Sequence, residues 1–411
     1  LADESNTKEE NYKYYNSEDE VKEAYDKAVE DARKVLTKEN VTYNALIPTV
    51  LKRGCEKYNN QLEISKKLEE MYDATFGIGI TKVGNNEVLK FYLESLNNNY
   101  LPNNEDLSKT SIEMLLNIVM KPYLVNGKFD DDYVEQEKEN LKKVIESRKD
   151  NKDTYATNRL LEEMFKEEPY GLYKFGNIDE IDNITSKKLY EKYKELIKNS
   201  EKYLYIVGDV ENLNIESYNI DEKEITISKE FPVKISEKEN IVKEQMDVTQ
   251  GKLVIGLNTP NNKQEVIALY NTILGKGANS KLFLNVREKE GLAYSAGSTY
   301  LKRNNAIIIS TGIEVSKYNK AVEVIKKQLK DMEDGNITEK EMKDAKQFIN
   351  AGLNLINESS ENMIEYRFDK DLYNEEIDIE KYRKEIEEIK KEDIVKVAKQ
   401  IKIDTIYFLG N

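Results

Sequence analysis

The sequence contains no histidine among its 411 residues. Imidazole is the most common general base of enzymes and a principal protein ligand of zinc. Its absence excludes Ser-His-Asp and Cys-His catalysis, and it also excludes a His-x-x-Glu-His zinc site. A metal bound by this chain would need carboxylate ligands alone, and these suit magnesium or calcium better than zinc.

Cysteine and long apolar runs are also scarce. The single Cys55 cannot form an intramolecular disulfide, which fits a reducing compartment, and without histidine we expect a packed thiol rather than a nucleophile. No apolar run approaches the roughly 20 residues of a membrane span. No signal segment is recognisable, although the chain opens on Leu1 rather than Met, so a processed N-terminus stays open. We therefore expect a cytoplasmic protein without a membrane partner.

Basic side chains are fewer than acidic ones. The chain has 63 basic and 78 acidic side chains, a net charge of −15, which argues against nucleic acid or an anionic membrane as the main partner. Its length exceeds what one hydrophobic core usually serves, so two domains are expected.

Local patterns predict a mixture of helices and strands. Apolar residues at helical spacing and a capping box of Ser17 and Glu20 predict a helix over 17–36. Residues 43–52 predict a second helix, interrupted at Pro48. Residues 74–95 alternate around a Gly-Asn turn, as a β-hairpin does.

The ends of the two halves of the chain follow one pattern. Residues 180–209 and 386–411 each run from a polar turn through a helix and a short polar link to an apolar strand ending in Gly and a polar residue. This predicts an internal repeat of domain size, and thus two similar α+β domains; the alternative is a chance recurrence of helix and strand. We place an N-terminal acidic, helical segment at 1–37, a first domain at 38–210, a connector at 211–245 and a second domain at 246–411.

The most informative stretch for chemistry is SKLFLNVREKEGLAYS. It holds Arg287 and Tyr294 on either side of Gly291, and an arginine and a tyrosine delivered by a helix end and the next strand can stabilise an oxyanion. The alternative is a surface arginine and a half-buried sheet tyrosine.

Two other motifs favour structural interpretations. GKGANSK at 275–281 lacks the preceding strand and the Gly-Lys-Ser/Thr ending of a phosphate loop. Several glutamates share one predicted helix with interspersed lysines, which indicates a solvated, salt-paired face rather than an acid/base pair; these are Glu135, Glu137, Glu139 and Glu146 with Lys138, Lys142 and Lys143.

Three stretches together carry a family resemblance: NVTYNALIPTVLKRGCEKY, EEPYGLYKFGNIDEIDNIT leading to YLYIVGDV, and SKLFLNVREKEGLAYS. Over residues 38–411 the chain resembles the pitrilysin family of insulinase-type zinc peptidases, specifically its zinc-less YmfF-like branch, which is associated by name with elongation factor P modification. The resemblance implies two homologous domains of the mitochondrial-processing-peptidase type, each a mainly antiparallel sheet with helices packed on one face. It also implies an initial strand where the local pattern predicts the helix 17–36, so either the N-terminus differs or that helix prediction fails.

The resemblance also locates a lost metal site. Active members carry His-x-x-Glu-His on a helix of the first domain, and anchoring on Gly54 places Ala45, Pro48 and Thr49 at those three positions. Glu146 resembles the later glutamate that completes the zinc site in active relatives. One carboxylate cannot hold zinc alone, so no metal or other cofactor is expected in this chain.

The second domain retains an arginine and a tyrosine that match the family pattern. Arg287 and Tyr294 stand where the family supplies an arginine and a tyrosine to the substrate, which implies a non-catalytic subunit serving a zinc-bearing homologue that cleaves peptides or unfolded protein. The alternative is a purely structural or peptide-holding homologue. A histidine-free hydrolase using Ser/Lys or acidic residues is a third possibility, and no motif supports it.

Overall fold

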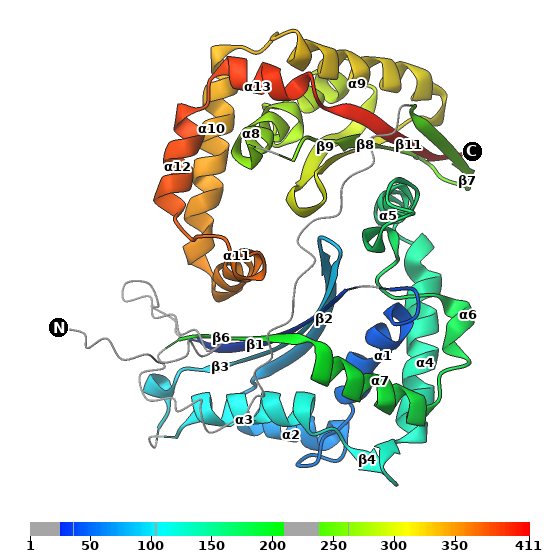
Figure 1. The fold of residues 1–411 in the computed structure, drawn as a ribbon, viewed down its shortest axis with the longest axis vertical. Coiled ribbons are helices and arrows are strands. Elements are labelled where there is room, and N and C mark those ends of the chain that lie inside the picture. Colours follow the sequence, from blue (N-terminus) through cyan, green and yellow to red (C-terminus); the bar gives the residue numbers. More distant parts are fainter. Residues whose placement is uncertain (1–24, 36, 103–104, 209–237, 262) are drawn as a thin grey trace, which may run out of the picture.

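The computed structural model describes residues 25–35, 37–102, 105–208, 238–261 and 263–411. We call residues 25–208 the first half and residues 238–411 the second half. Each half contains one large sheet, and most helices of each half lie on the side of its sheet that faces away from the other half (Figure 1). The mixed helix and sheet architecture expected from the sequence is confirmed.

The first sheet has the strand order β2-β3-β1-β6, with every neighbouring pair antiparallel. Its strands are β1 (Tyr25–Val35), β2 (Thr75–Val83), β3 (Asn86–Leu96) and β6 (Glu201–Val207). The hairpin β2–β3 turns at Gly84, whose φ of +58° suits the first position of a two-residue turn. The predicted hairpin is therefore confirmed.

The second sheet has the order β7-β11-β8-β10-β9, and only the pair of β7 and β11 is parallel. Its strands are β7 (Asn240–Gln245), β8 (Gly251–Asn258), β9 (Ala293–Leu301), β10 (Ala306–Ile313) and β11 (Lys402–Gly410). Residues 240–245, which the sequence analysis places in the connector, thus form a strand of this sheet.

The helices mostly follow the predicted segments. The first half has α1 (Val41–Leu51), α2 (Gln61–Glu70), α3 (Leu107–Met120), α4 (Asp131–Glu146), α5 (Lys152–Met164), α6 (Ile178–Ile181) and α7 (Ser186–Asn199); the second has α8 (Gln264–Gly275), α9 (Tyr318–Glu333), α10 (Glu339–Asn354), α11 (Ser360–Leu372), α12 (Ile379–Glu388) and α13 (Lys391–Ala398). Thr185 caps α7, and Thr338 and Glu341 form a capping box at the start of α10. Pro48 does not break α1, which is continuous through it.

The predicted helix over 17–36 is wrong where the structure describes it. Residues 25–35 form β1, which pairs along its length with β3 and over seven residues with β6. A strand in the middle of a sheet gains backbone hydrogen bonds on both edges, and this pairing overrides the helix propensity of its Glu, Lys and Ala residues. The initial strand implied by the family resemblance is confirmed, while Ser17 and Glu20 lie outside the described residues.

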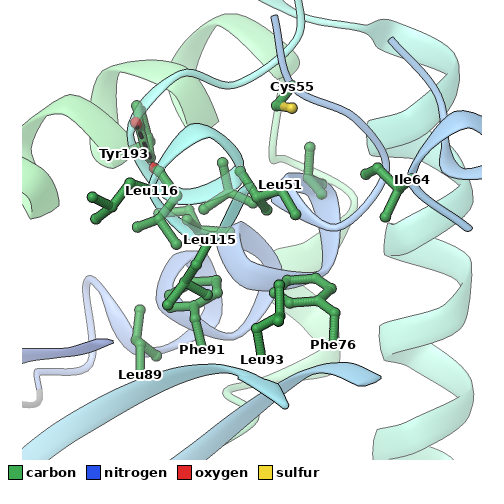
Figure 2. Packing of buried hydrophobic residues seen from close by; sticks show 14 of the residues in the cluster. Leu51, Cys55, Ile64, Phe76, Leu89, Phe91, Leu93, Leu115, Leu116 and Tyr193 are labelled. Atoms are coloured by element: carbon green, nitrogen blue, oxygen red, sulfur yellow. Dashed lines mark hydrogen bonds between the residues drawn. The ribbon is translucent and has the colours of Figure 1, made fainter. Parts of the chain in front are cut away.

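The first core lies between the first sheet and its helices. Leu46, Ile47 and Leu51 of α1 are almost completely buried against it. Figure 2 shows Leu51 and the α3 residues Leu115 and Leu116 above Phe76, Leu89, Phe91 and Leu93 of the hairpin strands. Burying such a side chain contributes roughly 1.5–3 kcal/mol. The same packing fixes α1, the helix that carries Ala45, Pro48 and Thr49.

Each half also packs one helix against the other half's sheet (Figure 1). On α5, Tyr155, Ala156 and Leu160 join a cluster with Val254, Ile308, Tyr407 and Leu409 of the second sheet. On α11, Ile364, Phe368 and Leu372 join a cluster with Val88, Tyr205 and Val207 of the first sheet. The two halves are therefore braced reciprocally.

Candidate functional site

Ala45, Pro48 and Thr49, which the family resemblance aligns with the zinc motif, lie on α1, and none has a carboxylate, thiol or imidazole side chain. Ala45 is 1% exposed, Pro48 is buried, and the Thr49 hydroxyl donates to the Leu46 carbonyl at 2.9 Å. Glu146 is an exposed residue at the end of α4. Within the described residues, no group of three or more carboxylate or thiol side chains is arranged to hold a metal ion. These residues do not fit a zinc ion.

Arg287 lies on a short π-helix, Phe283–Lys289, that precedes β9. The neighbouring Val286 is completely buried and anchors the turn, while the Arg287 side chain is 42% exposed. Its guanidinium stacks 4.6 Å from the Phe283 ring centroid, and its Nε lies 3.5 Å from Glu288 Oε1. π-Helical turns are rare and often occur at functional sites. The arginine is thus held at the surface with its end accessible.

Tyr294 lies near the start of β9, the edge strand of the second sheet. Gly312 of β10 pairs with Ser295 and the next residue, Ile313, pairs with Ala293, so the register skips Tyr294. This is a β-bulge, a feature that re-aims a side chain. Tyr294 is consequently 64% exposed although Ala293 is buried. It is not the half-buried sheet tyrosine of the alternative interpretation.

Gly291 joins the π-helix to β9 and sets the relation between Arg287 and Tyr294. Its φ of +56° belongs to the left-handed region, which favours glycine. The Leu292 amide donates to the Val286 carbonyl at 3.0 Å, and the Lys317 amine donates to the Gly291 carbonyl at 3.4 Å. The two candidate residues therefore leave one tight, hydrogen-bonded turn, and both are open to solvent.

The first half presents a second feature, the edge of β2. Val83 and Asn86 close the two-residue hairpin and are hydrogen-bonded to each other. Every second residue of β2 therefore directs its backbone N–H and C=O groups away from β3; these residues are Phe76, Ile78, Ile80 and Lys82. The Lys174 amine donates to the Ile80 carbonyl at 2.8 Å, which agrees with an Ile80 backbone that faces away from β3. β2 has no second strand neighbour within the described residues. An extended peptide can pair with such an edge.

Comparison with known proteins places the chain in a family. A family model described as "Peptidase M16 inactive domain" matches residues 183–349. "Probable inactive metalloprotease YmfF" of Bacillus subtilis (strain 168) is 34% identical over 385 residues, covering 91% of this chain and 90% of that protein. This chain belongs to the M16 peptidase family, the family of pitrilysin. Its similarity to YmfF assigns it to the branch described as inactive.

Two further relatives extend the comparison of this M16 homologue. "Uncharacterized zinc protease YmfH", also of Bacillus subtilis (strain 168), is 29% identical over 170 residues, covering 39% of each chain. A crystal structure of a conserved protein from Enterococcus faecalis V583 matches with a TM-score of 0.85 at 25% identity and covers 94% of both chains. The fold is therefore shared over nearly the whole length.

In this M16 homologue the glutamates of α4 divide into two groups. Glu135 pairs with Lys138 at 2.8 Å and Glu139 with Lys142 at 2.7 Å, as predicted for a salt-paired face. Glu137 differs, because it is buried and accepts a hydrogen bond from Arg53 Nε at 2.5 Å. This contact fixes the end of the α1 segment on α4. Local sequence patterns do not indicate the pairing, because Arg53 and Glu137 are far apart in the chain.

Cys55 follows α1 and is completely buried. Burial raises the pKa of its thiol, so the neutral form dominates near neutral pH. Cys55 and Pro122 also form an isolated backbone bridge. These contacts agree with the packed, unreactive thiol expected from the sequence.

No helix within the described residues has the length and apolar character needed to cross a membrane.

Proposed function

We propose that this chain is the non-catalytic subunit of a two-chain M16 peptidase. In this proposal a zinc-bearing homologue holds the metal, and this chain supplies Arg287 and Tyr294 to the composite site. The observation that carries the proposal is the contrast between the two places: α1 offers no metal ligand, while the arginine and tyrosine are both presented to solvent from one fixed turn.

We further propose that the two halves are homologous domains of the mitochondrial-processing-peptidase type. The sheet orders support this: β6-β1-β3-β2 of the first half corresponds, strand for strand in chain order, to β11-β8-β10-β9 of the second. α1 follows β1 as α8 follows β8, and α7 precedes β6 as α13 precedes β11. By this correspondence β9, which carries Tyr294, is the counterpart of the β2 edge.

The chemistry assigned to the pair is electrostatic. The Arg287 guanidinium and the Tyr294 phenol donate hydrogen bonds to the scissile carbonyl as its oxygen becomes negative. Such donors act strongly only in a water-excluded site, so the partner must cover these exposed side chains before they contribute. Losing one donor of this kind typically costs about 10²–10³ in kcat. The peptide itself pairs with the β2 edge.

The existence of YmfH, named as a zinc protease, beside YmfF in Bacillus subtilis (strain 168) supports a partner of this kind. We propose that the pair is cytoplasmic and acts on peptides or unfolded protein. Neither chain is expected to cleave peptide at the rate of the mixture, and the isolated chain described here is expected to bind no zinc.

The test mixes this chain with a zinc-bearing M16 homologue from its own organism and follows cleavage of a fluorogenic peptide library. We expect zinc-dependent activity in the mixture, with turnover lowered about 100- to 1,000-fold by Arg287→Ala and less by Tyr294→Phe. Arg287→Lys keeps the charge but not the planar fork, so it should recover only part of the loss.

Tyr72→Phe is the matched control, since Tyr72 is another exposed tyrosine, located on the first half. It should leave turnover unchanged. If Arg287→Ala and Tyr294→Phe both retain full activity in a mixture that cleaves peptide, the composite site is wrong and the peptide-holding alternative is favoured. That alternative rests on the β2 edge, which has no second strand neighbour within the described residues, and requires no zinc-bearing partner in co-purification.

A further inference from the structure

Two lysines lie together at the β2 edge without a carboxylate partner. Lys82 is the second-to-last residue of β2, and Lys174 lies in the loop that follows α5. Both are partly buried, and within the described residues neither forms an ion pair. Buried or half-buried lysines are normally paired with an acid, so this arrangement calls for an explanation.

The two amines bind backbone instead. Lys82 Nζ donates to the Tyr170 carbonyl at 2.6 Å and to the Leu172 carbonyl at 2.8 Å, and it lies 4.5 Å from the Tyr170 ring centroid. Lys174 Nζ donates back to the Ile80 carbonyl at 2.8 Å. The lysines thus join the loop to the strand from both sides.

Nearby acids are already engaged. Glu162 of α5 binds Arg148 and Arg159, and Glu87 of β3 accepts a hydrogen bond from Asn44 at 2.5 Å. Burial, followed by the interaction with Lys174 and Arg148, lowers the pKa of Lys82 to about 8, while Glu162 and Glu87 oppose that shift. Burial also lowers the pKa of Lys174. The site therefore holds excess positive charge in a chain whose net charge is −15.

Holding the loop does not use all the donors. An ammonium carries three N–H donors. Within the described residues Lys82 uses two of them and Lys174 uses one, so each amine retains capacity for a ligand. At this end of β2 the backbone groups of Ile80 and Lys82 face away from β3, and the Ile80 carbonyl accepts a hydrogen bond from Lys174. A peptide paired with the edge at Phe76 and Ile78 therefore ends beside both amines.

We propose that Lys82 and Lys174 form a carboxylate-binding site that selects an acidic position in the peptide paired with β2. The carboxylate comes from an Asp or Glu side chain or from the C-terminus of the peptide. This inference rests on the proposed function insofar as β2 is the peptide-binding edge, and it adds the substrate class, an extended peptide with a negative charge near one end of the paired segment.

The test measures binding to the full chain alone, without the partner and without any cleavage. The probes are fluorescein-labelled peptides of alternating Thr and Val residues read by fluorescence anisotropy. One has a central Glu and a C-terminal amide, one has Gln in its place, and one has Gln with a free C-terminal carboxylate. We expect the charged peptides to bind about five- to tenfold more tightly than the neutral one, in proportion to one charge-assisted contact.

Lys174→Gln and Lys82→Gln should each reduce this preference to about twofold or less while the neutral peptide keeps its affinity. Lys192→Gln is the matched control, because Lys192 lies on the outer helix α7 and pairs with Glu195. The preference should also decline as the pH rises through about 8, where Lys82 loses its proton. If Lys82→Gln fails to fold, Lys174→Gln still tests the site, because Lys174 makes only one hydrogen bond within the described residues.

The outcomes separate the two proposals. Equal binding of all three peptides to the wild-type chain, or a preference that survives both lysine variants, overturns the carboxylate site and leaves the β2 edge as a peptide site. Failure of every peptide to bind overturns the edge and the carboxylate site together. Neither result bears on Arg287 and Tyr294, which are tested by turnover in the mixture. A preference only for the free C-terminus identifies the peptide end as the ligand.

Discussion

The two halves of the molecule have the same order of strands but offer different chemistry. The edge strand β2 of the first half presents backbone groups and two lysines, whereas the edge strand β9 of the second half carries an exposed tyrosine beside an exposed arginine. The helix α1 beside β2 is packed with apolar residues where active relatives bind zinc, by the family resemblance.

Where the family resemblance aligns α1 with a zinc motif, the structure has packed apolar side chains and hydrogen-bonded polar groups. Ala45 is part of a continuous core and Pro48 is buried. The polar residues of α1 bind protein partners: Asn44 donates to Glu87 at 2.5 Å and Thr42 to Glu180 at 2.6 Å. These contacts fix α1 within the first half, while Arg287 and Tyr294 of the second half are exposed to solvent.

The largest effect is expected where the halves brace each other. Phe368→Ala removes a fully buried ring that packs edge-on against Tyr203 and Tyr205 of the first sheet, and it should lower the free energy of unfolding by about 3–5 kcal/mol. Leu160→Ala, on the reciprocal helix α5, should cost about 2–5 kcal/mol. Denaturant titration measures both. Phe348→Ala, at a phenylalanine 47% exposed, is the control and should cost far less.

If only one of the two buried substitutions destabilises the chain, the bracing is not reciprocal, and the half with the costly substitution depends on the other. Equal losses support the symmetric description.

A smaller effect is expected at the ion pair that anchors the end of α1 on α4. Arg53→Met leaves the Glu137 carboxylate buried without its main cation and should cost on the order of 1–3 kcal/mol. The double variant Arg53→Met with Glu137→Met should recover part of that loss, since no charge remains buried. Lys192→Met, at an exposed pair, should change stability by less than about 1 kcal/mol. A double variant as unstable as the single one would contradict this account.

Local signals in the sequence account for much of the fold. The β2–β3 hairpin, the Thr185 cap and the Thr338–Glu341 box depend on residues close together in the chain, so their patterns suffice. β1 is the exception because its partners, β3 and β6, lie far along the chain and its own composition favours a helix.

The candidate site shows the same division. That Ala45, Pro48 and Thr49 are not zinc ligands follows from residue identity and needs no structure. The exposure of Tyr294 depends on a register shift between β9 and β10, which alternation of apolar residues does not encode. Lys82 and Lys174 are separated in the chain by β3 and the helices α3 to α5, and each alone resembles any surface lysine.

The turn between Arg287 and Tyr294 provides a sharper test of the second half. Gly291→Ala places a side chain in open space but at a φ of +56°, so its cost is backbone strain of about 1 kcal/mol. Gly352→Ala is the matched control: it lies inside α10, also meets no neighbouring atom, and should stabilise by about 0.5–1 kcal/mol. Thermal unfolding measures both. Stabilisation by Gly291→Ala would show that the turn does not need glycine.

The smallest expected effect is a pH dependence at the junction of α5 with the second sheet. Burial disfavours the charged Glu244, but hydrogen bonds from Tyr155, Tyr407 and Arg159 outweigh it and hold the pKa of Glu244 below its usual value. The resulting stability is present above the normal glutamate pKa and is lost as the pH falls through the lowered folded-state pKa. Glu244→Gln should therefore be less stable than the wild type at neutral pH, and the difference should shrink in acid. Because Tyr155 and Arg159 belong to the first half and Tyr407 to the second, a difference that stays constant from neutral pH to pH 3 would mean that ionisation of Glu244 does not hold the halves together.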